Sequence, residues 1–307
     1  MDVYATDISG PEAQSLLLLK SELSVEIRVG RRVRRPLFGR GEGAPWVAGA
    51  DVTGPRAGTI LYAPIDETIK QVAAQNPKTP IFWAESFDPA LRQDLPAGAV
   101  ALPRLVPEMF FPPGPGADTF GVTRRLHLEG RPRVVYVGQY DEGASLTALF
   151  ELTRRLFTTG GEVVLWEGLA RRDALAPVVK TLRLSETVVF APPLNLEEAA
   201  GLFLGADVIW VGEANPRQDL ALTWAMASGA PIVARYSKPS EAVLGPAALW
   251  VYDDDLDVME EALLTALQNS IIREELQQRQ GELAHPWRFG EAAPAWIAAI
   301  SGSDEFG

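Results

Sequence analysis

Two loops carry the charged side chains best placed to bind a ligand. The polar loop at residues 213–219 contains Arg217, and the loop at residues 235–240 contains Lys238, with Glu241 directly after it. Each loop follows a short apolar run, VIWV or PIVA, that suits a strand buried on both faces. Parallel sheets bind ligands at the carboxyl ends of their strands, so we expect a ligand site at these loops. For Arg217, a solvated loop charge is an equally good interpretation.

The acidic run near residue 253 also has a spacing that could bind a ligand. Asp253, Asp254, Asp255 and Asp257 suggest a metal cluster, but the run lacks the glycine and the terminal glutamate of a calcium loop. We prefer an acidic helix start that complements the helix dipole. The chain has no cysteine, no G-x-S-x-G motif and no G-x-G-x-x-G motif at residues 138–143. Thiol, nucleophile-elbow and dinucleotide chemistry are therefore disfavoured, and we expect neither a metal nor an organic cofactor.

The elements that position these loops alternate between strands and helices. Apolar runs suited to strands occur at residues 3–5, 25–28, 46–52, 59–62, 79–84 and 99–102, and again at 133–137, 162–166, 187–190, 208–211, 231–234 and 248–251. Helix formers lie between them, for example at residues 220–228, which end at Gly229 as a C-terminal cap. This alternation predicts an α/β fold with doubly wound parallel sheets.

A segment rich in proline and glycine separates the two series of strands. Residues 107–116, PEMFFPPGPG, cannot continue regular structure. We therefore expect a Rossmann-like domain at residues 1–106, a linker at 107–132 and a second Rossmann-like domain at 133–288. A C-terminal helix and tail occupy residues 289–307.

Composition limits the class of protein. The chain has 307 residues, of which 47% are hydrophobic and 22% charged, as is ordinary for a globular protein. No apolar run approaches the roughly 20 residues of a membrane-spanning helix. The N-terminus, MDVYATDISG, lacks the basic start and apolar core of a signal peptide. With no cysteine to form disulfides, a reducing cytoplasm is the expected location.

The charge distribution bears on binding partners. The net charge of −12 argues against a nucleic-acid binder. One segment is an exception, because six arginines cluster between residues 28 and 40: Arg28, Arg31, Arg32, Arg34, Arg35 and Arg40. A solvated basic loop is the simpler interpretation. The sharper one is contact with a phosphate, an acidic protein partner or an anionic membrane surface.

Three blocks of the second half resemble the retaining family 4 glycosyltransferases, which have the GT-B fold. The block VVYVGQYDEGASLTALFELTRRL is similar to the family's strand, Gly-Arg turn and following helix. The block RLSETVVFAPPLNLEEAAGLFLGADVIWV is similar to the next segment of the family, and AMASGAPIVARYSKPSEAV with GPAALWV to the last. The similarity runs nearly without gaps from about residue 133 to 284. It is thin in the first half, where LPRLVPEMFFPP resembles the segment before the linker.

The resemblance implies two Rossmann-like domains facing a cleft, with the C-terminal helix crossing back towards the first domain. The second domain would hold a nucleotide-diphosphate sugar and the first an acceptor. Negative charge builds on the leaving diphosphate as the glycosidic bond breaks, so such a site needs cations. The family places an Arg directly after the strand glycine and a Lys a few residues later. It also uses two glutamates, spaced eight apart, to hold the sugar and the ribose.

This sequence departs from that pattern at the cations. Gly138 is kept, but Gln139 stands at the Arg position. The Lys position falls at Ala144 or Ser145, and no Lys or Arg lies between Arg133 and Arg154. Each lost cation removes charge-assisted hydrogen bonds of about 1.5–3 kcal/mol. Removing one such stabiliser commonly costs about 10²–10³ in rate.

The carboxylates depart as well. Alignment on AMASG places Pro216 at the first glutamate and Trp224 at the second, and Glu241 keeps a family carboxylate. In the first domain, Glu85 and Ser86 stand where the family has a histidine, and Gly10 resembles a remnant of its glycine-bearing first loop.

Two hypotheses follow from these substitutions. In the first, the protein binds or transfers a sugar from a nucleotide-diphosphate donor with an atypical site. The donor residues would be Gly138, Gln139, Arg217, Trp224, Lys238 and Glu241, and the acceptor-side residues Gly10, Glu85 and Ser86. In the second, it is an inactive glycosyltransferase homologue that acts as a binding or assembly subunit beside a protein partner.

Overall fold

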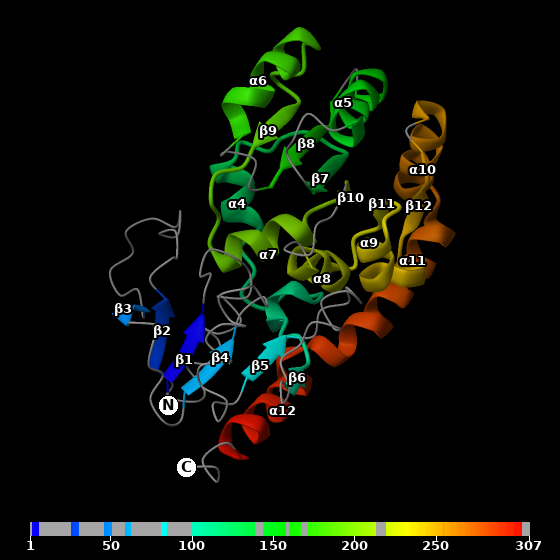
Figure 1. Cartoon of the computed structure of the whole chain (residues 1–307). Helices are drawn as coiled ribbons and strands as arrows, with labels where there is room; N and C mark the ends of the chain where they lie inside the picture. Colours follow the sequence, from blue (N-terminus) through cyan, green and yellow to red (C-terminus); the bar gives the residue numbers. More distant parts are fainter. Residues whose placement is uncertain are drawn as a thin grey trace. The chain divides into compact units, whose positions relative to one another are not determined.

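The structure is a computed structural model, shown in Figure 1. It describes residues 103–302, apart from 139–143, 158–159, 167–170, 213–218 and 254, and before residue 103 the backbone of six strands. The chain forms two compact units. One unit comprises Met1–Pro107 together with Pro286–Gly307, and the other comprises Glu108–His285.

The first unit contains a six-stranded parallel sheet with the strand order β3-β2-β1-β4-β5-β6. Its strands are β1 (Asp2–Ala5), β2 (Glu26–Gly30), β3 (Trp46–Ala50), β4 (Thr59–Tyr62), β5 (Ile81–Ala84) and β6 (Val100–Leu102). The strand order reverses between β1 and β4, as in a doubly wound Rossmann sheet. Each strand overlaps a run expected from the sequence.

The C-terminal segment belongs to this first unit. Val106 donates its backbone N–H to Trp287 at 2.7 Å and accepts the N–H of Phe289 at 2.9 Å. Helix α12 (Phe289–Gly302) is fixed further, because the indole nitrogen of Trp296 donates to the carbonyl of Pro103 at 2.7 Å.

The second unit contains a six-stranded parallel sheet with the equivalent order, β12-β11-β10-β7-β8-β9. In Figure 1 this sheet runs from β12, in yellow, to β9, in green. Its strands are β7 (Arg133–Val137), β8 (Glu162–Leu165), β9 (Val188–Phe190), β10 (Val208–Val211), β11 (Ile232–Arg235) and β12 (Leu249–Val251). Both sheets are doubly wound and Rossmann-like, as the sequence predicts.

Helices cover both faces of the second sheet. The helices after β7 are α5 (Ala144–Leu156), α6 (Arg172–Thr181), α7 (Leu196–Leu204), α8 (Asp219–Ser228), α9 (Lys238–Leu244), α10 (Leu256–Gln268) and α11 (Ser270–Ala284), the last of which packs on α8, with short 3₁₀ turns at Gly245–Ala247 and His285–Trp287. Helices α5, α6 and α10 bury their apolar sides on the face that carries Tyr136 and Trp210. Among the described residues, no helix combines the length and apolar character needed to cross a bilayer.

The linker expected at residues 107–132 contains regular structure, and from Glu108 on it belongs to the second unit. A 3₁₀ turn, η1 (Glu108–Phe110), buries Phe110, and α4 (Thr119–Arg125) packs on α7. The close approach depends on Gly201, where a Cβ atom would lie 2.5 Å from the carbonyl of Asp118. The prolines do limit regular structure here, but they do not prevent Phe110 and Phe111 from being buried.

Helix α9 (Lys238–Leu244) begins inside the loop expected at residues 235–240, so that expectation is wrong for residues 238–240. Ser237 caps the helix by accepting the backbone N–H of Ser240 at 3.2 Å. Pro239 lies in the first turn, where a missing N–H costs nothing. Lys238 and Pro239 thus start the helix. Asp255 likewise caps α10 by accepting the N–H of Asp257 at 2.8 Å, in keeping with the expected acidic helix start.

Buried charges hold the amino ends of the central strands together. The Arg133 side chain donates to Glu162 at 2.5 Å, and both residues are less than 5% exposed. The backbone N–H of Arg133 donates to Asp207 at 2.7 Å, which ties β7 to the start of β10. This network lies at the end of the sheet opposite to the ligand loops.

Candidate donor site

The strand order of the second sheet reverses between β7 and β10, which lie side by side. Gly138 and Gly212 directly follow these two strands, and Gly212 donates its N–H to Val137 at 2.9 Å. In an open α/β sheet the crevice at such a reversal is the usual ligand site. The geometry therefore supports a ligand site between Gly138 and Gly212.

The ring of Tyr136 lies against the two glycines of this crevice, and Tyr136 was not among the site residues predicted from the sequence. Its ring is 1% exposed, and its phenol oxygen lies 2.7 Å from where a Cβ atom on Gly138 would be. A Cβ atom on Gly212 would lie 2.9 Å from two carbons of the same ring. Both glycines are thus required by a neighbouring side chain, whether or not a ligand approaches. The sequence does contain a cue, because VVYV has one polar aromatic side chain in an otherwise apolar run ahead of a glycine.

Trp224 lies in α8 and is 1% exposed. Its ring stacks on Phe110 with centroids 4.4 Å apart, and it lies 6.2 Å from the ring of Trp166. Phe203 contacts both Phe110 and Trp166 edge-on, which completes an aromatic cluster in the core. The space beside Trp224 is therefore filled by side chains of the same unit. Its expected contact with a donor stays a prediction, and its packing role is established by this geometry.

Lys238 and Glu241 lie on the first turn of α9, just beyond the carboxyl end of β11. Both side chains are exposed. Glu241 accepts the phenol hydroxyl of Tyr236 at 2.9 Å, and this hydrogen bond raises the pKa of Tyr236 above its ordinary value of 10.0. Glu241 is thus held by a tyrosine next to the sheet and keeps acceptor capacity, since a carboxylate has about four acceptor positions.

Several expected site residues lie outside the described part of the chain. These are Gly10, Glu85 and Ser86 on the acceptor side, and Gln139, Pro216 and Arg217 on the donor side. Of the arginine cluster, Arg28 lies in β2 as backbone only, and residues 31–40 lie outside. Gln139 directly follows Gly138, and Arg217 belongs to the segment that follows Gly212. The roles of these residues stay predictions.

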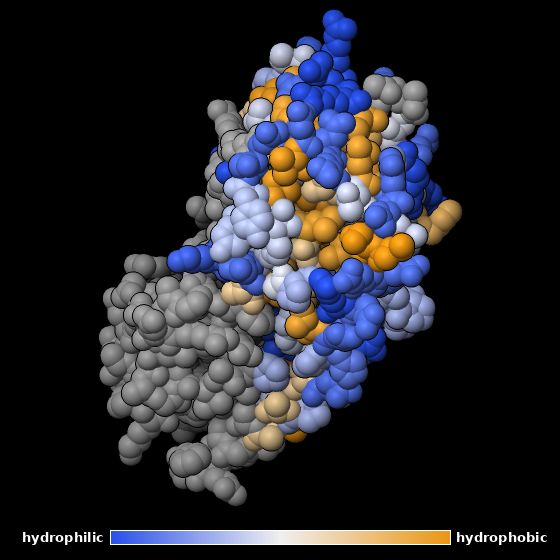
Figure 2. All heavy atoms as spheres, turned by 90° about the vertical axis from the view of Figure 1, so that its right-hand side faces the viewer, coloured by the Kyte–Doolittle hydropathy of each residue, from blue (hydrophilic) through white to orange (hydrophobic). Residues whose placement is uncertain are grey.

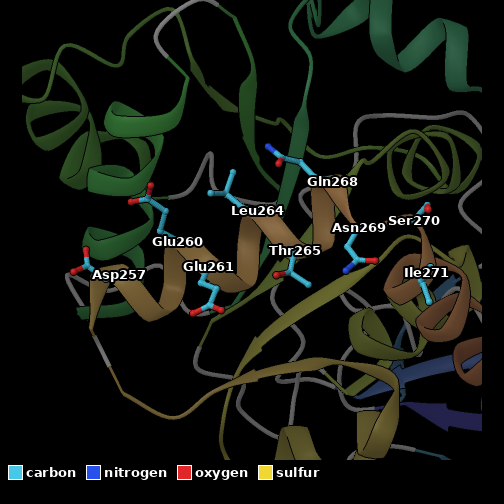
Figure 3. A pocket seen from close by; sticks show the side chains of 9 residues that line it. All are labelled: Asp257, Glu260, Glu261, Leu264, Thr265, Gln268, Asn269, Ser270 and Ile271. Carbon is cyan, nitrogen blue, oxygen red and sulfur yellow. The ribbon is translucent and has the colours of Figure 1, made fainter.

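A groove of about 780 Å³ runs along α10 to the start of α11. Figure 3 shows Asp257, Glu260 and Glu261 projecting along one part of α10, with Ile271 at the other end. The guanidinium of Arg155 donates to Asp257 at 3.2 Å and to Glu260 at 3.4 Å, which raises the pKa of this arginine. Figure 2 shows this side of the molecule, on which hydrophilic residues surround a band of apolar ones. An acidic lining repels a diphosphate, so the groove is not the donor site. Within the described residues, no group of three metal-binding side chains comes together.

Comparison with known proteins identifies the fold to which this arrangement of strands belongs. No protein-family model and no curated protein matches the sequence. Among solved structures, HepE of Anabaena in complex with UDP-glucose is similar with a TM-score of 0.69 at 10% identity, covering 98% of this chain and 99% of that one. The fold is that of the GT-B glycosyltransferases.

Two further structures agree with this fold. Sucrose-phosphate synthase from Thermosynechococcus elongatus has a TM-score of 0.67 at 14% identity, covering 99% of this chain and 98% of that one. WaaG, a glycosyltransferase involved in lipopolysaccharide biosynthesis, has a TM-score of 0.67 at 11% identity, covering 98% of this chain and all of that one. At these identities the GT-B likeness establishes the fold, and function must be argued from the site.

Proposed function

We propose that this GT-B protein binds a nucleotide-diphosphate sugar in its second unit and transfers the sugar with a rebuilt site. The observation that carries the proposal is the pair Gly138 and Gly212 at the reversal between β7 and β10. Tyr136 already accounts for both glycines, and it is their position at the strand reversal, where open α/β sheets bind ligands, that supports a phosphate site here. The likeness over nearly the whole chain to HepE, solved with UDP and with UDP-glucose, supports the same ligand class.

Arg217 is the candidate cation for the diphosphate. Its segment follows Gly212 directly, and residues 134–153 contain no Lys or Arg that could replace it. Gln139 would donate a neutral hydrogen bond from the other side of the crevice. Lys238 and Glu241 would contact the sugar from the start of α9. On the acceptor side, we propose Gly10, Glu85 and Ser86.

Thermal unfolding with added nucleotides tests the proposal. UDP, GDP, ADP and UDP-glucose are compared, and a ligand at 100 times its Kd stabilises by about 2.7 kcal/mol. We expect the Tm to rise by about 5 °C with at least one of them. Replacing Arg217→Gln should weaken binding by about tenfold or more, since a charge-assisted hydrogen bond is lost. The matched control is Arg154→Gln, whose exposed side chain pairs with Glu151 on α5. No shift with any nucleotide, or equal losses in both variants, would contradict the proposal.

A second candidate is an inactive homologue that binds a ligand or a protein partner without transferring sugar. The observation that favours it is the absence of any Lys or Arg from residues 134–153, where the family has two cations. Release of UDP from UDP-glucose separates the candidates. Binding without release, before and after Gln139→Arg, would support the inactive homologue. Steady release by the unaltered protein would exclude it, and a lone monomer that captures no partner would count against an assembly role.

The arginine cluster at residues 28–40 supports a separate proposal about membrane binding. Six guanidinium groups attract anionic lipid by about 1 kcal/mol each near a membrane surface. We propose a peripheral contact with the cytoplasmic leaflet. Sedimentation with vesicles of phosphatidylserine and phosphatidylcholine should fall sharply after Arg31, Arg32, Arg34 and Arg35 are changed to Gln. Equal sedimentation with purely neutral vesicles would show that the cluster is only a solvated loop.

A further inference from the structure

Three aromatic side chains gather near the carboxyl ends of β11 and β12, the two strands at one edge of the second sheet. We call Tyr236, Trp250 and Tyr252 the aromatic platform. Tyr236 directly follows β11 and Tyr252 directly follows β12. The backbone N–H of Tyr236 donates to Val251 at 2.8 Å, which fixes the two chain segments beside each other.

The rings of the platform support one another. Tyr236 and Tyr252 stack with centroids 5.0 Å apart and planes 29° apart. Trp250 meets Tyr236 edge-on at 5.8 Å, and its indole nitrogen donates to the carbonyl of Gly245 at 3.0 Å. The outer ring, Tyr252, is nevertheless 71% exposed. A large ring that is held in place and left open to solvent suits a planar or ring-shaped ligand.

The platform has a carboxylate at its edge. Glu241 accepts the hydroxyl of Tyr236 at 2.9 Å and is itself exposed, so it can accept further hydrogen bonds from a ligand. An aromatic face with a carboxylate beside it matches a sugar ring. The C–H groups on one face of the sugar lie against the aromatic ring, while its hydroxyls donate to the carboxylate.

Charge selects between ring-shaped ligands. Asp253 directly follows Tyr252 and is exposed, and Glu241 accepts the hydroxyl of Tyr236, so two carboxylates adjoin the platform. Lys238, exposed on the same turn of α9, and Arg235, directly before Tyr236, offset part of this charge. A ligand with several phosphates therefore finds no excess of cations here, whereas a neutral sugar needs none.

We propose that the aromatic platform binds a neutral sugar ring, with Tyr252 as the stacking face and Glu241 as the hydroxyl acceptor. This site lies at the edge of the second sheet, whereas the crevice between β7 and β10 is central. A neutral glycan would therefore be held beside the donor crevice, with Glu241 shared between the two sites. The proposal does not depend on nucleotide binding.

Titration with neutral oligosaccharides, followed by saturation-transfer NMR, tests the platform. Maltotetraose, cellotetraose and triacetylchitotriose are the probes. We expect at least one of them to bind with a millimolar Kd. Tyr252→Ala should raise that Kd about tenfold, because stacking of a ligand on an aromatic ring contributes about a factor of ten to affinity. Tyr252→Phe keeps the ring and should retain binding. Glu241→Gln should weaken binding by a similar factor, because a charged acceptor is lost.

Phe120 supplies the matched control, because it is 77% exposed on α4, which is not part of the platform. Phe120→Ala should leave oligosaccharide binding unchanged. The proposal is wrong if none of the probes binds, or if Tyr252→Ala and Phe120→Ala behave alike. It is also wrong if Tyr252→Ala weakens UDP binding and leaves oligosaccharide binding intact. Failure of nucleotide binding alone would contradict the proposed function and leave the platform standing.

Discussion

The ring of Trp224 stacks on the ring of Phe110, with centroids 4.4 Å apart and planes 25° apart. Phe110 lies in the turn before α4, and Trp224 lies in the helix whose sequence, AMASG, most resembles the glycosyltransferases. A residue aligned with a family glutamate is thus part of the core. Phe110 and Trp224 are both buried, which means that the position can no longer hold a carboxylate without rebuilding the core.

Trp224→Glu is accordingly expected to destabilise the protein and not to restore a donor contact. The change removes a stacked ring and buries an unpaired charge, and such changes cost about 4 kcal/mol or more. Urea unfolding measures the loss, and Trp224→Phe, which keeps an aromatic ring, is the control. A gain in UDP-glucose binding with unchanged stability would show that the side chain faces the donor after all.

The contact between Tyr136 and Gly212 gives a second prediction. A methyl group on Gly212 would press on a ring that is 1% exposed, so Gly212→Ala should cost about 1–3 kcal/mol. In a Tyr136→Val background the ring is gone, and the same change should cost less than about 1 kcal/mol. Gly281→Ala on α11 is the control, since a Cβ atom there meets nothing within 4 Å. Equal costs in both backgrounds would mean that Gly212 is required for a reason other than the ring.

The sequence predicted the sheets well because buried parallel strands are short apolar runs bounded by loop residues. VIWV and PIVA became β10 and β11 with nearly their expected bounds, and Gly229 ends α8 with a φ of +70°. Strand order did not follow from these local patterns, because it depends on pairing between distant segments such as Val208 and Val134.

The site was harder to predict because its geometry comes from long-range packing. The pairing of Trp224 with Phe110 joins two segments that carry no local sign of each other. The role of Tyr136 depends on the two glycines above its ring, one of which follows a different strand. Helix α9 was missed because residues 235–240 were assigned to a loop, although Pro239 suits the first turn of a helix. Alignment with the glycosyltransferase family pointed to the loops at the carboxyl ends of the second sheet, but it could not predict the contacts of Trp224 and Tyr136.

The buried pair of Arg133 and Glu162 leads to a stability prediction. Glu162→Leu leaves the guanidinium of Arg133 without its carboxylate, in a site where both residues are less than 5% exposed. Breaking a buried pair costs about 3–5 kcal/mol, whereas replacing both partners is often neutral. We expect Arg133→Met with Glu162→Leu to recover most of the stability lost in the single variant, as measured by urea unfolding.

An exposed pair on α11 serves as the comparison for this experiment. Arg279 and Glu275 form an ion pair with side chains that are 44% and 48% exposed. Glu275→Leu should change the stability by no more than about 1 kcal/mol, because solvent screens exposed pairs. A loss as large as that of Glu162→Leu would mean that burial does not set the cost.

The hydrogen bond between Tyr236 and Glu241 predicts a pH dependence. It raises the pKa of Tyr236 above 10.0 in the folded protein, so the neutral phenol is favoured by folding. Its contribution to stability is fully present below the unfolded pKa of about 10 and is lost as the pH rises through the higher folded value.

Absorbance of tyrosinate during an alkaline titration should therefore show one tyrosine that ionises late. Glu241→Ala should move that step down to the ordinary range, Tyr236→Phe should remove it, and Glu275→Ala, a change to a distant carboxylate, should leave it in place. A late step that survives Tyr236→Phe would assign it to another tyrosine.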